Sequence, residues 1–309
     1  MIPIFFMELL LTSNRPNHGA LLLMALMVLI WGATWVVLKF LAPHIGPFDL
    51  VVLRYSIGFL ALLALLIATR QSLRCPPFWL TLGIGFFQTA AFSCLSQFAL
   101  LTGGAGHVVM LAYTMPFWVL GLAWFFLQER PTRRHGFGCV LAGLGLIAVI
   151  APWQGLGSIV SSLLAVASGI SWGIATILSK LMFQRHSPNV LALATWQMFL
   201  GALLTVPFAV LQPQPFIDWQ PELILGIAFL GVVSSAAGWG LWLLVVRRVS
   251  ATAAGMSSLA VPVLTIFLAW ILLGERPTTL ELAGITLMMA GLTVVSLSPV
   301  VQKPVSRSA

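Results

Sequence analysis

Two stretches decide the fold. Residues 31–39 read WGATWVVLK and residues 172–180 read WGIATILSK, and each lies inside a long apolar run. A proline follows each stretch at the same distance, Pro47 after the first and Pro188 after the second. The matching tryptophans, lysines and prolines are all 141 positions apart, which indicates an internal repeat.

A second set of matches extends the repeat toward the end of each half. Residues 129–131 read Glu-Arg-Pro, and residues 275–277 read the same. These two motifs are 146 positions apart, whereas the first set of matches is 141 positions apart. The second half has therefore gained five residues between the two sets. Three single residues also match at the offset of 146 positions: Pro116 with Pro262, Trp124 with Trp270, and Gly138 with Gly284.

The composition places this repeat in a membrane. Of the 309 residues, 60% are hydrophobic and only 7% are charged, and the mean hydropathy is +1.05. A soluble domain carries about a quarter charged residues, because its surface faces water. The 15 Lys and Arg residues form no continuous basic face, so we expect membrane lipid as a partner and no nucleic acid.

Ten apolar runs are candidate membrane spans, since a crossing helix needs about 20 apolar residues. We predict an all-α integral membrane protein with one five-helix repeat in residues 20–150 and a second in residues 159–298. Residues 1–19 and 299–309 are predicted to be cytoplasmic. The predicted spans are 20–41, 48–68, 79–101, 106–127, 136–150, 159–180, 190–211, 223–246, 251–273 and 280–297.

The cations of the connecting loops predict the orientation. With a cytoplasmic N-terminus, eleven Lys and Arg residues fall inside and only Arg276 falls outside. A cytoplasmic excess of this kind sets the orientation of membrane proteins. We therefore expect a multi-pass protein of a bacterial inner membrane with both termini in the cytoplasm. The eleven are Arg15, Arg70, Arg74, Arg130, Arg133, Arg134, Arg185, Arg247, Arg248, Lys303 and Arg307.

The odd number of spans in each half has a topological consequence. Because the first half ends on the opposite side from where it began, the second half enters the membrane inverted. Inverted repeats build many secondary transporters, in which the two halves exchange conformations and give alternating access. The sequence thus predicts a transporter of small molecules.

These motifs resemble the EamA-type branch of the drug/metabolite transporter superfamily. The resemblance covers residues 20–298 and rests on Trp31-Gly32-x-Thr34 with Lys39, on Pro47 with Arg54, and on the two Glu-Arg-Pro turns. It implies ten helices around a central cavity and the export of amino acids or other small metabolites. The repeat equivalent of Arg54 is Thr195, so the two halves do not form a symmetric pair of cations there.

Six polar or aromatic side chains near span centres are the predicted substrate ligands. Aromatic rings beside isolated amides and hydroxyls suit a zwitterion with an apolar side chain. A buried glutamine needs several hydrogen-bond partners, so it is a better ligand candidate than Ser or Thr, which often bond their own helix. The six are Gln88, Tyr113, Gln197, Trp239, Trp35 and Ser93.

Three cations within the spans each have two interpretations, since ionisable groups in a membrane are costly. Lys39 and Lys180 lie near opposite ends of equivalent spans, where they either reach the lipid headgroups or gate opposite mouths of the cavity. Arg54 lies about seven residues into the second span, too deep to reach the headgroups easily. It either bonds backbone carbonyls or steers anionic groups of the substrate, and we favour the structural role.

Two prolines, Pro116 and Pro262, fall near the middle of the fourth and ninth spans, at equivalent positions of the repeat. A proline inside a helix frees a carbonyl and kinks the helix. Symmetric kinks at one depth are typical of transporter binding sites, and a kink that serves packing alone is the alternative. We predict that these kinks frame the binding site.

A channel or facilitative pore and a membrane-embedded enzyme are the alternatives to a carrier. A channel would need a ring of charge or a Gly-rich filter, and neither pattern is visible. The five histidines lie at span ends or in loops on alternating faces, so we expect no enzyme activity, metal site or cofactor. The lack of Asp or Glu at mid-span favours facilitated diffusion or exchange over proton coupling.

The fifth and tenth predicted spans are the shortest, and they carry glycines such as Gly145 and Gly284. Small residues let membrane helices approach closely. We expect both spans at the periphery, where they either pack tightly on other helices or form a homodimer contact.

Overall fold

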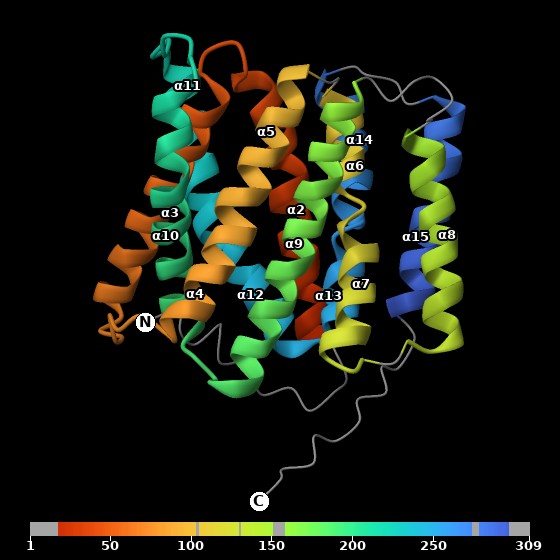
Figure 1. Ribbon diagram of the computed structural model, residues 1–309. Helices are drawn as coiled ribbons and strands as arrows, with labels where there is room; N and C mark the ends of the chain where they lie inside the picture. Colours follow the sequence, from red (N-terminus) through yellow and green to blue (C-terminus); the bar gives the residue numbers. More distant parts are fainter. Residues whose placement is uncertain (1–17, 103–104, 130, 151–157, 274–277, 297–309) are drawn as a thin grey trace, which may run out of the picture.

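A computed structural model describes residues 18–102, 105–129, 131–150, 158–273 and 278–296, and within these residues every element is a helix (Figure 1). Eight helical segments are long and apolar enough to cross a membrane. The described chain is therefore that of an all-helical, multi-pass membrane protein. The eight segments are Leu22–Leu41, Pro47–Ala68, Phe78–Leu101, Val108–Phe126, Ile159–Arg185, Val190–Leu211, Pro221–Arg248 and Ala251–Leu272.

Two further helices correspond to the predicted fifth and tenth spans. They are α8 (Arg133–Ile150) and α15 (Thr279–Ser296), with 18 residues each. The first turn of α8 holds two arginines and a histidine, and the apolar part of α15 is only Leu282–Val294. Length and composition therefore support eight spans, and they do not by themselves make α8 and α15 the two further spans that were predicted.

The first half of the chain supplies α2 (His18–Leu41), α3 (Pro47–Ala68), α4 (Phe78–Ile84), η1 (Gly85–Ala91), α5 (Phe92–Thr102), α6 (Ala105–Ala112), α7 (Met115–Phe126) and then α8. The second half supplies α9 (Ile159–Arg185), α10 (Val190–Leu211), α11 (Pro221–Ala228), η3 (Phe229–Ala237), α12 (Gly238–Arg248), α13 (Ala251–Ser257), α14 (Ala260–Leu273) and then α15.

Helix starts follow ordinary capping chemistry. Ser158 caps α9 by accepting a hydrogen bond from the Ser161 amide, and Asn189 caps α10 by accepting from the two amides that follow Val190. Proline occupies the first turn of α3 and of α11. The N–H groups of a first turn have no intrahelical acceptor, so proline, which has no N–H, costs no hydrogen bond there. These caps satisfy backbone donors that lipid cannot satisfy.

The third span of each half is interrupted by a π-helical segment. η1 joins α4 to α5, and η3 joins α11 to α12. A π-helical segment adds a residue to the turn and is frequent at functional sites. The two segments occupy equivalent places in the two repeats, which the sequence did not predict.

The fourth span of each half is broken rather than smoothly kinked. The helix stops at a turn at residues 113–114 before α7 begins at Met115, and a turn at residues 258–259 separates α13 from α14. Pro116 lies in the first turn of α7, and Pro262 is the third residue of α14. Each proline thus starts a new helix, because it cannot bond into a preceding turn.

The two ends of the molecule differ in charge. The arginine-rich end, as we call it, holds the start of α8, the ends of α9 and α12, and the loop after α3 (Figure 1). It therefore carries Arg70, Arg74, Arg133, Arg134, Arg185, Arg247 and Arg248. The opposite end holds the starts of α3 and α11, with Asp49 and Glu222 in their first turns. The equivalent helices α2 and α9 run in opposite directions between these ends (Figure 1).

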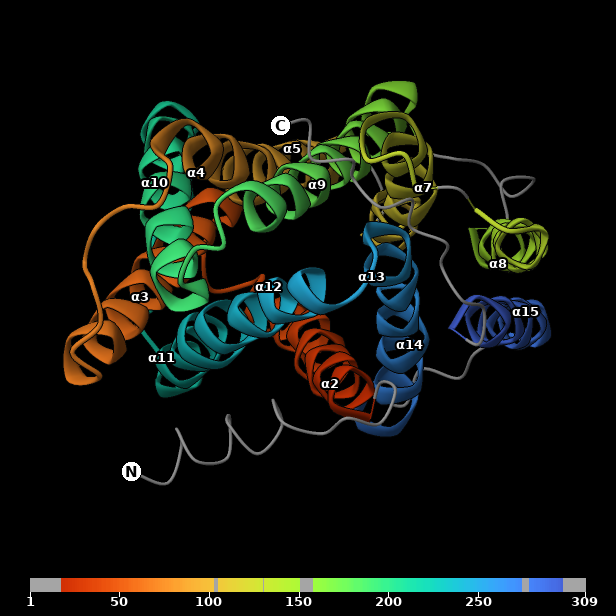
Figure 2. The ribbon, with the colours of Figure 1, turned by 90° about the horizontal axis from the view of Figure 1, so that it is seen from below.

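Beside the main body, α8 and α15 lie next to each other as a pair (Figure 2). A Cβ added at Gly145 would lie 2.5 Å from the Gly284 carbonyl oxygen, and one at Gly291 would lie 2.4 Å from the Gly138 carbonyl oxygen. The glycines thus bring these two helices into backbone contact. The close packing predicted for these glycines is therefore between α8 and α15.

Candidate functional site

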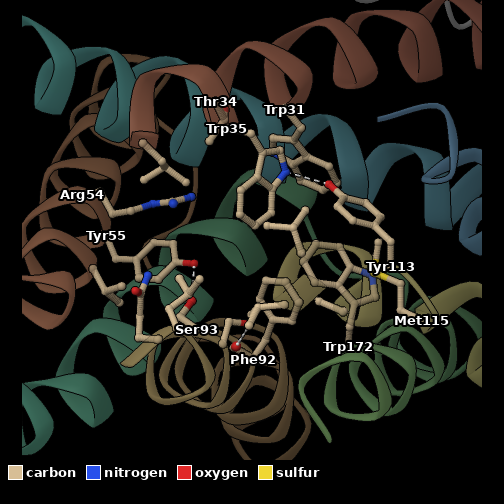
Figure 3. Close-up of a pocket in the computed structure, with 18 of the residues that line it drawn as sticks. Trp31, Thr34, Trp35, Arg54, Tyr55, Phe92, Ser93, Tyr113, Met115 and Trp172 are labelled. Carbon is tan, nitrogen blue, oxygen red and sulfur yellow. Dashed lines mark hydrogen bonds between the residues drawn. The ribbon is translucent and has the colours of Figure 1, made fainter. Parts of the chain in front are cut away.

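A central cavity of about 90 Å³ lies between the two halves of the chain (Figure 3). Helices α2, α3, α5, α6 and α7 supply most of its lining, and α9 and α12 supply one tryptophan each. The polar lining is Thr34, Arg54, Tyr55, Ser93, Ser96, Gln97 and Tyr113. The aromatic lining is Trp31, Trp35, Phe92, Trp172 and Trp239.

One wall of the cavity is polar and carries the cation. The Arg54 Nε–H donates to the Ser235 hydroxyl oxygen at 3.2 Å, and the Arg54 Cζ lies 4.8 Å from the centre of the Tyr55 ring. The hydroxyls of Tyr55 and Ser93 are 2.8 Å apart. This wall therefore joins α3 to α5 and to η3 and holds the guanidinium in one orientation.

The facing wall is built by α2 and α6, and Figure 3 shows Tyr113 across the cavity from Arg54 and Tyr55. The Trp35 indole N–H donates to the Tyr113 hydroxyl oxygen at 2.8 Å. On the same helix, the Thr34 hydroxyl donates to the Ser234 hydroxyl of η3 at 2.8 Å. Both hydrogen bonds fix side chains that line the cavity.

A cluster of four tryptophans lies at the depth where the two halves meet. The Trp31 ring centre lies 5.4 Å from that of Trp172, 5.8 Å from that of Trp239 and 5.9 Å from that of Trp242. All four side chains are at least nine-tenths buried. Three of these tryptophans, Trp31, Trp172 and Trp239, also line the central cavity.

Four of the six predicted ligands line the central cavity: Tyr113, Trp239, Trp35 and Ser93. The other two, Gln88 and Gln197, do not. The Gln197 Nε2 lies 3.3 Å from the Gln88 Oε1, and both side chains are fully buried between η1 and α10. Their amides are thus placed to hold two helices together.

Several cavity residues were absent from the predicted ligands, among them Tyr55 and Gln97. Tyr55 follows Arg54 on α3, and Gln97 lies one turn after Ser93 on α5. The chain contains only two tyrosines, and both line the cavity, so the scarcity of this residue type is a signal that could have identified Tyr55.

At the arginine-rich end, hydrogen bonds from Lys180 and to Glu129 hold the connection between α12 and α13. The Lys180 ammonium of α9 donates to the Val246 carbonyl at 3.0 Å and also to the Val249 carbonyl. The Glu129 carboxylate accepts from the Ala251 and Thr252 amides at 2.9 and 3.1 Å. Opposite charges thus meet the two helix ends that attract them, a cation at the end of α12 and an anion at the start of α13.

The remaining predicted residues fall outside the cavity lining. Lys39 is exposed near the end of α2, away from the arginine-rich end. Pro116 is buried directly after Met115, which does line the cavity. Pro262 is buried on α14. The break at Pro116 therefore shapes one edge of the cavity, whereas the break at Pro262 lies elsewhere.

A second hollow of about 510 Å³ lies on the other side of α5, between η1, α9 and α10. It is larger than the central cavity, but apolar side chains such as Phe86, Phe98 and Phe208 form nearly all of its lining. A site for a polar solute needs a few placed polar groups. The central cavity provides them and is the candidate site.

Known proteins with related sequences are transporters. A probable amino-acid metabolite efflux pump of Salmonella typhimurium is 31% identical over 283 residues, which are 87% of this chain and 92% of that protein. A probable amino-acid metabolite efflux pump of Escherichia coli is 28% identical over 87% of this chain and 92% of that protein. An uncharacterized transporter of Bacillus subtilis is 27% identical over 85% of this chain and 92% of its own.

A solved crystal structure shares the fold. It matches with a TM-score of 0.77 at 20% identity and covers 91% of this chain and 97% of that one. The EamA-like transporter family matches twice, over residues 18–151 and 160–297, in agreement with the internal repeat. The chain therefore belongs to the EamA-like transporter family.

Proposed function

We propose that the protein exports small amino acids across the inner membrane by alternating access. The observation that carries this proposal is the central cavity, which sets a polar wall with Arg54 and Tyr55 against an aromatic lining at the interface of the two repeats. Substrate sites of transporters built from inverted repeats lie at that interface. Relatives named amino-acid metabolite efflux pumps support the substrate class.

The cavity volume limits the size of the solute. A cavity of about 90 Å³ favours a solute with few non-hydrogen atoms. L-Valine has eight non-hydrogen atoms, and its side chain is apolar, as the aromatic lining requires. Amino acids of this size are the proposed substrates.

The proposed topology has ten spans, with α8 and α15 as the fifth and tenth. The arginine-rich end faces the cytoplasm, because loop cations collect on that side. The cavity residues of α2, α3, α5 and α6 lie nearer the opposite end, which supports assigning this arrangement to the outward-facing state. Both termini are then cytoplasmic.

The proposed gate at the cytoplasmic end is the connection between α12 and α13, held by Lys180 and Glu129. Lys39 occupies the equivalent position of the other repeat and gates the outer mouth of the cavity. The breaks before Pro116 and Pro262 let the short helices on either side tilt separately. Release of one end as the other closes would pass the solute across the membrane.

Flux measurements test this proposal. Proteoliposomes loaded with L-valine should exchange it for external labelled L-valine, with a rate that saturates and rises with internal valine. A rate that grows linearly with concentration and ignores internal valine would establish the channel alternative instead. Equal flux in liposomes without protein would refute transport of small amino acids.

A further inference from the structure

We infer that Arg54 and the hydroxyls beside it bind the carboxylate of the transported solute, which makes Arg54 a specificity-determining residue. This inference rests on the proposed function, because it names the group that the central cavity recognises in its substrate.

The first argument is the depth of the charge. Arg54 lies seven residues after Pro47 on α3, about 10 Å along a helix axis. Its side chain is half-buried and lines the central cavity. A cation at such a depth is costly unless an anion accompanies it. Among the described side chains, no carboxylate forms an ion pair with it.

The second argument is the number of donors that Arg54 leaves available. A guanidinium carries five N–H groups. Its Nε–H is used by the Ser235 hydroxyl, and the cation lies against the Tyr55 ring. Within the described residues, no other hydrogen bond of this guanidinium is formed. The terminal N–H groups can therefore grip the two oxygens of a carboxylate as a fork.

The third argument concerns two further donors among the lining residues. The indole N–H groups of Trp172 and Trp239 are buried without an acceptor among the described residues. Buried donors are rarely left unpaired. Arg54 and these two tryptophans thus carry unpaired N–H groups, and an ionised carboxylate is a ligand that only accepts.

The geometry then orients the solute. The carboxylate lies at the polar wall, within reach of Arg54 and of the hydroxyl pair formed by Tyr55 and Ser93. The rest of the solute lies against the aromatic rings of α2 and of Tyr113, which follows α6. The position equivalent to Arg54 in the second repeat is Thr195, a buried residue that bonds its own helix, so the cavity has one carboxylate subsite and not two.

Binding of three ligands of matched size to the purified protein tests the inference: L-valine, L-valinamide and 3-methylbutanoate. L-Valinamide keeps the amino group and lacks the carboxylate, whereas 3-methylbutanoate keeps the carboxylate and lacks the amino group. Loss of a charged hydrogen-bonded pair weakens affinity by about ten- to a hundredfold. The wild type should therefore bind L-valine that much more tightly than L-valinamide.

The variant Arg54→Gln should bind both ligands with equal, weak affinity, and Arg54→Lys should keep part of the preference. Arg185→Gln, an exposed arginine at the end of α9, is the matched control and should keep the wild-type preference. If Arg54→Gln does not fold, the wild-type preference and the Arg54→Lys variant still decide the question.

The outcomes separate this inference from the proposed function. Binding of 3-methylbutanoate but not of L-valine, lost in Arg54→Gln, would support the carboxylate subsite and refute amino-acid export. Binding of L-valine that Arg54→Gln leaves unchanged would support the function and overturn the subsite. Equal wild-type affinity for L-valine and L-valinamide, or failure to bind either carboxylate, would also overturn it.

Discussion

The carboxylate of Glu129 is the most heavily bonded side chain at the arginine-rich end. It accepts from two backbone amides of α13 and from the Thr252 hydroxyl at 2.8 Å, and it is 4% exposed. Glu129→Ala leaves these donors buried and unpaired, so the free energy of unfolding should fall by about 1–3 kcal/mol. Thermal unfolding in detergent measures this loss. Glu222→Ala, in the exposed first turn of α11, should change stability much less.

The buried amide pair of Gln88 and Gln197 makes a different residue-scale prediction. Each single change to Leu leaves one buried amide without its partner and should cost about 1–3 kcal/mol of stability. The double variant should lose less than the sum of the two, with a coupling of about 0.5–3 kcal/mol. Affinity for L-valine should stay within about twofold of the wild type, since neither side chain lines the cavity. A tenfold loss of affinity in either single variant would show that these glutamines belong to the binding site.

At the scale of elements, α9 holds the connection between α12 and α13 through Lys180. Lys180→Met removes both hydrogen bonds to the carbonyls, so the arginine-rich end, proposed to face the cytoplasm, should open more often. A cysteine at Ala254, fully buried on α13, should then react several times faster with a maleimide supplied from the cytoplasmic side. Arg185→Gln is the control. An unchanged labelling rate in Lys180→Met would show that Lys180 does not hold the proposed gate.

That experiment needs a background without the native cysteines. Cys94 on α5 and Cys139 on α8 are buried. Cys75 lies in the connection between α3 and α4, where burial raises the pKa of its thiol and so slows its reaction as a thiolate. All three can be replaced by serine or alanine before Ala254→Cys is introduced.

The packing of α8 on α15 makes a second prediction at this scale. Gly145→Ala places a Cβ 2.5 Å from the Gly284 carbonyl oxygen, so the two helices must separate and the protein should lose about 1–3 kcal/mol of stability. Gly136→Ala on the same helix meets no atom within 4 Å, which makes it a matched control that should be neutral or slightly stabilising. Equal melting temperatures for the two variants would show that this contact is not tight in the membrane.

At the scale of the whole molecule, the charge difference between the two ends predicts the topology. Reporter fusions after Arg70, after Arg134 and at the C-terminus should all be active in the cytoplasm, and a fusion in the loop at Asp218 should be active outside. A C-terminal fusion that is active outside would refute the even number of spans and, with it, the assignment of both α8 and α15.

Much of the architecture was predictable because lipid imposes a simple rule. Each span must be long, apolar and helical, so the apolar runs located the eight established segments, and the repeated Trp-Gly and Glu-Arg-Pro motifs located the two halves. The membership in the EamA-like family followed from the same motifs and is confirmed.

The cavity lining was harder to predict, since nearly every face of each span is apolar and periodicity does not separate the lipid face from the cavity face. Gln88 and Gln97 illustrate the difficulty. They lie nine residues apart on the third span, about two and a half turns of a regular α-helix, a spacing that would place them on opposite faces of such a helix. Only Gln97 shares a face with Ser93, and this spacing could have favoured it over Gln88.

The paired π-helical segments also record how the chain arose. η1 and η3 lie at matching positions of two repeats that now share few other residues, and each depends on one extra residue in a helix. Two independent insertions at one place are a poor explanation, so the wide turn predates the duplication.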